Sequence, residues 1–179
     1  MFKKTLMVAG LVLSAVFANP ADANPSIEPL VQETVVKLNT YASFCAANVE
    51  LCAVNQAGAA PVYSAAELTA VNTKINAAIE YEPEAVETWT VNPTEGDCED
   101  FALTKMVALL ALGYPRNQLH FTLVVVKETG EKHMVLTVET QAGTFVLDNR
   151  SKVVKRWDEV NSYKWVAVEQ LTVNQMTVH

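Results

Sequence analysis

Apolar positions in the first half of the chain return every three or four residues, as they do on one face of a helix. This spacing predicts a helix over residues 26–44 and a second over 65–80. A third helix is predicted over 98–112, with apolar residues on nearly every side. A helix of that composition is typical of a protein interior. Gly113 and Pro115 end it.

The second half of the chain has the composition of β-strands. Two of its segments flank Gln141-Ala142 and form a predicted hairpin. The segments 45–61 and 81–97 are predicted to be irregular. Helices followed by an antiparallel sheet predict an α+β fold. The predicted strands are 119–127, 132–140, 143–148, 153–156 and 163–171.

The first 23 residues have the features of a secretory signal peptide. Lys3 and Lys4 precede an apolar run, and Ala21-Asp22-Ala23 is a small-residue cleavage site. The run is too short for a comfortable transmembrane span. We therefore expect residues 24–179 to form a single domain that is periplasmic or secreted.

The net charge argues against nucleic acid as a partner. The 179-residue chain carries −7, and removal of the two lysines and one aspartate of the signal peptide gives −8. An acidic domain repels phosphate backbones, and no basic stripe opposes this repulsion.

Three cysteines in an exported protein leave one outside any single disulfide. Cys45 and Cys52 are close in sequence, so the simplest interpretation pairs them and leaves Cys98 as a thiol. Two buried, reduced thiols at 45 and 52 are the alternative.

Cys98 begins the third predicted helix, where the helix dipole favours a reactive thiolate. His133, in the first strand of the predicted hairpin, is the best placed base; His120 and His179 are the other histidines. If the hairpin loop has two residues, His133 lies diagonal to Asp148 on one face, within reach of a contact. The three residues have the roles of nucleophile, base and orienting acid in a catalytic triad. Taken singly, each also fits an ordinary core, strand or turn position.

Asp97, Glu99 and Asp100 surround the cysteine. They suit the start of a helix electrostatically and can cap it. Three carboxylates beside a thiol disfavour the thiolate, and a bound Ca²⁺ would remove this conflict. From chemistry alone, capping is the favoured interpretation.

The run from Trp89 through Gly96-Asp97-Cys98-Glu99-Asp100, together with His133-Met134-Val135-Leu136 and Val146-Leu147-Asp148-Asn149, resembles the bacterial transglutaminase-like cysteine proteinases. The similarity covers roughly residues 40–170. It implies a papain-like, transglutaminase-type core in which a buried, Cys-bearing helix packs on an antiparallel sheet, with further helices N-terminal to it.

The resemblance also implies roles for individual residues. It assigns Cys98, His133 and Asp148 to the triad, and no cofactor is needed for that chemistry. In the periplasmic LapG-type branch the acids beside the cysteine bind calcium, which maps onto Asp97 and Glu99. Trp89 then either lines the site or aids the oxyanion, or it belongs to the core.

For the activity, the resemblance implies a cysteine peptidase that acts through a thioester acyl-enzyme. Members of the LapG-type branch cleave large surface adhesins, and an inner-membrane receptor that senses cyclic di-GMP sequesters them. An acyl transferase or amidase on the same core, and a catalytically silent binding module, are the alternatives.

Overall fold

The computed structural model describes residues 40–53, 64–170 and 175–178. The predicted signal peptide, residues 1–23, and most of the predicted helix 26–44 lie outside the described residues. Within the described part, residues 40–47 are helical and a short helix, α2 (Val49–Cys52), follows. The segment 45–61 was predicted to be a loop. This prediction is wrong for its described beginning, which is largely helical. No described helix is both long and apolar enough to cross a membrane.

The two central helices form where the apolar spacing predicts them. Helix α3 (Ala65–Ala78) begins after Ser64, whose side chain accepts a hydrogen bond from the Glu67 backbone N–H at 3.2 Å. Helix α4 (Cys98–Ala111) is almost entirely buried along its first three turns. Gly113 follows with φ +92°, a conformation that glycine adopts without strain, and the helix ends there.

Among the residues that the structure describes, six antiparallel strands form the main sheet in the order β6-β5-β4-β3-β7-β8. Four of the five predicted strands agree with the structure to within a residue at each described end, whereas β6 covers only the last two residues of predicted 153–156. The last strand, β8, was not predicted, and it completes the edge beyond β7. The strands are β3 (Leu119–Val126), β4 (Lys132–Thr140), β5 (Gly143–Leu147), β6 (Lys155–Arg156), β7 (Tyr163–Gln170) and β8 (Gln175–Val178).

Two short strands stand at the two ends of the irregular segment that precedes α4. Strands β1 (Glu80–Tyr81) and β2 (Glu95–Gly96) pair in parallel and so bring the ends of this loop together. Strands of two residues cannot be predicted from the sequence, because a strand is recognised by the alternation of apolar and polar residues over a longer run. The pairing holds the chain immediately before Cys98.

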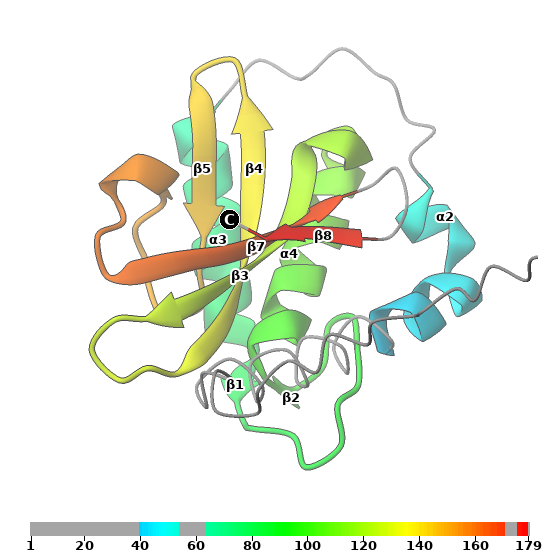
Figure 1. Ribbon diagram of the computed structural model, residues 1–179. Helices are drawn as coiled ribbons and strands as arrows, with labels where there is room; N and C mark the ends of the chain where they lie inside the picture. The colour runs from blue at the N-terminus through cyan, green and yellow to red at the C-terminus, as the bar shows by residue number, and fades with distance from the viewer. Residues whose placement is uncertain (1–39, 54–63, 171–174, 179) are drawn as a thin grey trace, which may run out of the picture.

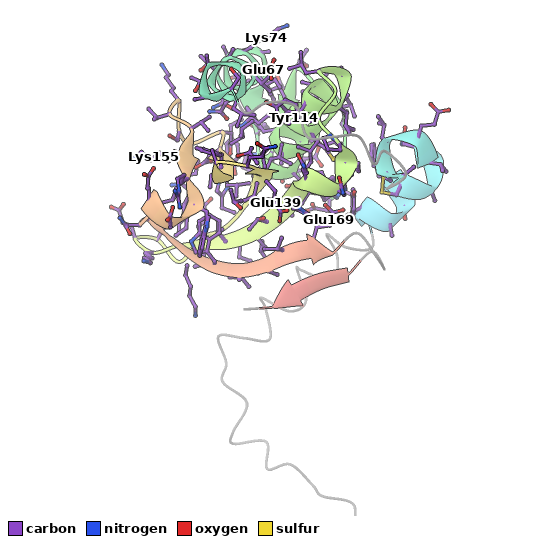
Figure 2. The ribbon with its side chains drawn as sticks, turned by 90° about the horizontal axis from the view of Figure 1, so that it is seen from above. Glu67, Lys74, Tyr114, Glu139, Lys155 and Glu169 are labelled. Carbon is purple, nitrogen blue, oxygen red and sulfur yellow. A yellow bond between two sulfur atoms is a disulfide. The ribbon has the colours of Figure 1, made fainter. Side chains whose placement is uncertain are left out.

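Helices α3 and α4 lie side by side on one face of the sheet, and β7 crosses in front of β4 and β5 because the sheet twists (Figures 1 and 2). The main core fills the space between these helices and the sheet, with Leu68, Leu103, Met106 and Leu136 fully buried. The buried Cys-bearing helix on an antiparallel sheet is the predicted α+β architecture. Figure 2 also labels Glu67 and Tyr114, whose hydroxyl donates a hydrogen bond to the Glu67 carboxylate at 2.8 Å and ties α3 to the end of α4.

The opposite face of the sheet carries a smaller apolar cluster that includes Val124, Val135 and Tyr163. The β3–β7 ladder has a bulge at Leu123/Val124: Val124 pairs with Trp165, whereas Leu123 pairs with Ala167. The bulge inserts one extra residue into β7 and shifts its register beyond that point.

A buried ion pair joins the sheet to the first described helix. Arg116 is 1% exposed and donates hydrogen bonds to Glu169 at 2.6 Å and to the Tyr41 hydroxyl at 2.7 Å. It also donates to the Leu119 carbonyl. A buried guanidinium with a carboxylate partner avoids the penalty of an uncompensated charge. This network fixes the 40–47 helix beside β3 and β7.

Candidate active site

Cys98 is the first residue of α4, and its side chain is 8% exposed. Asp97 before it is extended, with φ −103° and ψ −167°, so the chain turns sharply into the helix at the cysteine. Cys98 therefore lies at the positive end of the helix dipole, where the first backbone N–H groups have no partner within the helix. These are the conditions that favour thiolate and stabilise an oxyanion.

His133 and Asp148 are in contact. The β4–β5 ladder pairs Thr140 with Gly143 and continues to Leu136 opposite Leu147, which confirms the predicted two-residue loop. The diagonal that follows from this register brings His133 Nε2 to 2.8 Å from Asp148 Oδ1. Both side chains are buried, at 4% and 6% exposure.

Asp148 receives further donors that hold it in place. The Tyr163 hydroxyl donates to Oδ2 at 2.5 Å, and the Arg150 backbone N–H donates to Oδ1 at 2.9 Å. Burial alone would raise the pKa of Asp148, but the contact with His133 and the donors from Tyr163 and Arg150 outweigh it and lower the pKa. Asp148 is therefore an anion in a fixed orientation.

The start of α4 and the start of β4 lie near each other. Helix α4 packs against β4, the strand that carries His133. The pKa of Tyr81 is raised first by burial, and then by the negative charges of Cys98 and Glu131. Cys98 begins α4, and Glu131 is two residues before His133.

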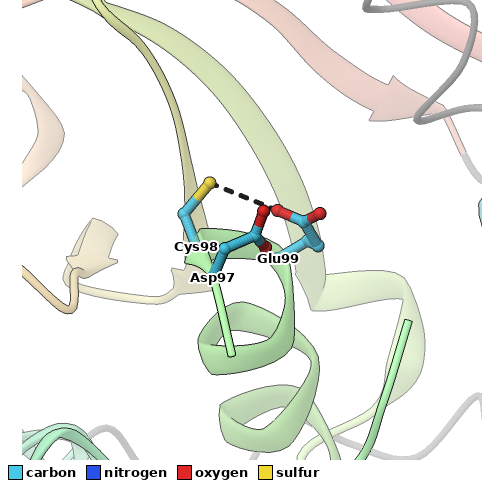
Figure 3. A group of neighbouring side chains, drawn as sticks. All are labelled: Asp97, Cys98 and Glu99. Atoms are coloured by element: carbon cyan, nitrogen blue, oxygen red, sulfur yellow. Dashed lines mark hydrogen bonds between the residues drawn. The ribbon is translucent and has the colours of Figure 1, made fainter. Parts of the chain in front are cut away.

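The acids around Cys98 differ from one another in their surroundings. Figure 3 shows Glu99, which is fully buried, accepting a hydrogen bond from the Cys98 thiol at 3.3 Å. Ligand atoms of Asp97, Cys98 and Glu99 all lie within 4.8 Å of one another. Although Asp97 occupies the N-cap position, its side chain makes no cap hydrogen bond.

Asp100 secures the helix start instead. It is fully buried and accepts a hydrogen bond from the Thr90 backbone N–H at 2.7 Å. Gly96 packs so closely on the Asp100 carboxylate that a Cβ at position 96 would collide with it. Burial raises the pKa of Asp100 to about 6, although backbone N–H groups oppose the rise. The capping interpretation therefore fits Asp100 better than it fits Asp97.

The family model described as bacterial transglutaminase-like cysteine proteinase BTLCP matches residues 31–178. The chain belongs to this family. The match covers most of the chain, including the cysteine helix and the histidine hairpin.

Two solved structures have the same fold as this cysteine proteinase. Calcium-bound LapG of Legionella pneumophila matches with a TM-score of 0.55 and 25% identity, over 63% of this chain and 67% of that chain. A second structure of Legionella pneumophila LapG gives 0.50 and 26%, over 58% and 64%. This proteinase thus spans about two thirds of the LapG chains that it matches. No curated protein matches it.

The cysteine assignment of the proteinase agrees with the prediction. Cys45 and Cys52 form a disulfide, and Cys98 is a buried thiol outside it. Trp89 belongs to the aromatic core, where it packs against Tyr41 and its indole N–H donates to Thr40 at 3.2 Å. Of the two interpretations of Trp89, the structure supports the core residue.

Three features of the site were missed from the sequence. Tyr163 and the Arg150 backbone N–H hold Asp148, and Lys105 lies buried on α4. No local pattern points to Tyr163, because it reaches Asp148 only through the pairing of β7 in the sheet. The Arg150 N–H is two residues after Asp148, and an aspartate that accepts from the backbone two residues on is a common turn pattern that could have indicated it. Lys105 had a signal: a charged residue in a helix that is apolar all round is exceptional.

Proposed function

We propose that this proteinase is an exported peptidase that cleaves protein substrates with Cys98, His133 and Asp148 as its triad. The hydrogen bond of 2.8 Å between His133 and Asp148 supports this assignment most strongly. Cys98 at the start of α4, the helix that packs on the His133 strand, supports it further. A histidine held by an aspartate and a thiol at a helix start are the parts that a nucleophile, a base and an orienting group require.

In the proposed mechanism the two ring nitrogens of His133 have different roles. Because Asp148 engages Nε2, Nδ1 is the nitrogen that exchanges a proton with Cys98. Cys98 Sγ transfers its proton to Nδ1 and attacks the peptide carbonyl carbon. The tetrahedral oxyanion then lies near the first N–H groups of α4, which stabilise it.

Collapse of the tetrahedral adduct breaks the C–N bond. The imidazolium of His133 returns its proton to the leaving amine, and a thioester to Cys98 remains. His133 then takes a proton from water, whose oxygen attacks the thioester carbonyl. The carboxylic acid leaves as the C–S bond breaks, and Sγ recovers its proton.

Asp97 and Glu99 are the residues that would hold calcium. Their oxygens are hard ligands of the kind that Ca²⁺ prefers, and they lie close together at the helix start. The calcium-bound state of the Legionella LapG match supports the same assignment. Bound calcium would supply positive charge that favours the Cys98 thiolate.

The proposed setting is the periplasm or the cell exterior. The signal-peptide pattern of residues 1–23 supports export, and the Cys45–Cys52 disulfide is typical of oxidising compartments. By the family resemblance, the substrate is a cell-surface adhesin and the regulator is an inner-membrane receptor. Both partners are part of the proposal.

The decisive experiment compares point variants on surface proteins from the producing cell. Cys98→Ala and His133→Ala should each abolish cleavage while unfolding remains cooperative. His120→Ala is the matched control, because His120 contacts Glu139 at 3.4 Å, away from Asp148, and should leave cleavage unchanged. Full cleavage by Cys98→Ala would overturn the assignment. A labelled amine supplied as acceptor separates the alternatives: its incorporation into substrate would mean acyl transfer rather than hydrolysis.

A further inference from the structure

Two asparagines interrupt the apolar side of helix α3. Asn72 is 0% exposed and lies among the core residues Val71 and Ile75, and Asn76 follows it by about one helical turn. Asparagine is a poor helix former and is seldom fully buried. The Oδ1 atoms of both residues are buried and make no hydrogen bond to any residue that the structure describes, which adds to the cost. Two such residues on one helix require a reason beyond filling the core.

The amide nitrogens of both residues reach the turn that follows β5. Asn72 Nδ2 donates to the Ser151 carbonyl at 2.7 Å. Asn76 Nδ2 donates to the Asp148 carbonyl at 2.8 Å and to the Ser151 carbonyl at 3.2 Å. A carbonyl oxygen can only accept, so each amide must present its nitrogen here. The two side chains therefore hold both ends of the segment 148–151 against α3.

Asp148 is held from both faces of the sheet. Its side chain reaches Tyr163, which belongs to the cluster on the face opposite the helices, and it contacts His133 at 2.8 Å. Its backbone carbonyl instead accepts from Asn76 on α3, the helix that packs against β5 on the other face (Figure 1). Side-chain donors alone would leave the backbone of this turn free to move, whereas donors on both faces fix the position of the carboxylate.

We propose that Asn72 and Asn76 are positioning residues that hold Asp148 in place against His133. The inference rests on the proposed triad, and it adds α3 to the elements that build the site. The amides fix the backbone that carries Asp148, so their loss lets the turn shift and loosens the hydrogen bond between Asp148 and His133. The two asparagines act through Asp148 and not on the substrate.

Two substitutions at Asn76 distinguish a hydrogen-bond donor from a residue that only fills space. Asn76→Asp keeps the shape but replaces the nitrogen by an oxygen, which repels the carbonyls of Asp148 and Ser151. Asn76→Leu keeps a similar volume and has no donor. A space-filling residue would tolerate both changes. Val71→Ala is the matched control, because it removes core packing from the same helix without touching the turn.

The test is the rate at which the His133 Nε2–H proton exchanges with solvent, measured by NMR in the mature protein, residues 24–179. His133→Gln assigns the signal. The Leu103 amide, in the buried interior of α4, reports global unfolding, so exchange is expressed relative to it.

We expect Asn76→Leu to speed the relative exchange of the ring proton about tenfold, and Asn76→Asp to speed it further. Val71→Ala should leave the ratio unchanged. An unchanged ratio in Asn76→Leu would overturn the proposal, whatever Asn76→Asp does. The Arg150 amide donates to Asp148 Oδ1 at 2.9 Å and gives the same measurement if the ring proton exchanges too fast to observe.

Cleavage gives an independent readout of the same displacement. With each variant folded, cleavage of surface proteins from the producing cell should slow about tenfold in Asn76→Leu, because a shifted Asp148 no longer orients the base. Val71→Ala should remain within about twofold of wild type, since its folded state keeps the turn in place. Equal losses in Val71→Ala and Asn76→Leu would reduce both residues to a structural role and reject the inference.

These results are separable from the proposed function. If cleavage requires Cys98 but the exchange of the His133 proton ignores Asn76, only the present inference fails. If the exchange responds to Asn76 but cleavage does not require Cys98, the positioning of Asp148 stands and the proposed function fails.

Discussion

The acids of the site fall into two groups with opposite surroundings. Asp148 alone forms the first group, and Asp97, Glu99 and Asp100 form the second. At the end of β5, Asp148 receives hydrogen bonds from an imidazole, a phenol and a backbone N–H, and its pKa is lowered. At the start of α4, Glu99 accepts a bond from a thiol, and Asp100 has its pKa raised to about 6. Three acids share that short segment.

The two groups differ in what stabilises their negative charge. Asp148 is stabilised by donors that the fold itself provides, so it needs nothing from solution. Asp97 and Glu99 gather their oxygens beside one another and beside a sulfur, an arrangement that raises mutual repulsion as the groups ionise. A bound cation would relieve that repulsion. The first group is thus complete within the chain, and the second is expected to depend on calcium.

The largest effect expected from this contrast follows the loss of charge at Asp148. Asp148→Asn preserves the shape but leaves His133 without its anionic partner, and kcat/KM should fall by about 10³–10⁴. Because the fold supplies this group's compensation, added calcium should not restore the activity. Asp158→Asn, at an exposed acid paired with Arg156, is the control and should be silent. Rescue of Asp148→Asn by calcium would erase the distinction between the two acid groups.

Calcium should stabilise the wild-type protein through the second group. At a hundredfold excess over the dissociation constant, linkage gives about 2.7 kcal/mol. This corresponds to an increase in Tm of about 5–10 °C for a domain of this size. Thermal melting in calcium and in chelator measures it, and Asp97→Ala and Glu99→Ala should each remove the difference.

Asp100→Asn is the matched control for the calcium experiment. It keeps an oxygen to accept from Thr90, so it should lower stability modestly and retain the calcium response. Identical melting of wild type in calcium and in chelator would make these acids structural only.

The disulfide lies outside both acid groups and tests whether their behaviour is local. Replacing Cys45 and Cys52 by alanine opens a crosslink with a sequence separation of 7 and should destabilise the protein by about 2–3 kcal/mol. Urea unfolding measures the loss. The calcium response should persist in this variant, and its disappearance would show that the second group depends on the N-terminal helices.

Tyr163→Phe should have the smallest effect, about 1.5 kcal/mol, because it removes one of several donors to Asp148. That donor lowers the folded-state pKa of Asp148, so its contribution is present above the unfolded pKa, near pH 4, and is lost as pH falls through the folded pKa. Urea unfolding at pH 7 should show the destabilisation, and the difference between the two proteins should shrink as pH falls below the unfolded pKa of Asp148. Tyr81→Phe, at a half-exposed tyrosine, is the control. A loss that does not change with pH would mean that Tyr163 acts by packing alone.

Local patterns were sufficient for the parts of the site that depend on neighbours in sequence. The two-residue loop at Gln141-Ala142 determined the β4–β5 register, and with it the contact of His133 with Asp148. The start of α4 at Cys98 followed from the apolar run after it. These features need only the geometry of one hairpin and one helix.

Long-range partners could not be derived in this way. Tyr163 reaches Asp148 only because β7 returns beside β3, and nothing in the order of residues specifies that pairing. The division of labour between Asp97 and Asp100 was equally hidden, since both types suit a helix start. Only the approach of the Thr90 backbone distinguishes them.

The bulge in the β3–β7 ladder has a consequence for how one strand serves two sites. Tyr163 and Glu169 are six residues apart, an even interval that would place both on one face of a regular strand. The extra residue of β7 reverses odd and even positions between them. The strand therefore presents a phenol to Asp148 on one side and a carboxylate to Arg116 on the other. Without the bulge, both side chains would lie on the same face of β7. The strand could then bind either Asp148 or Arg116, but not both.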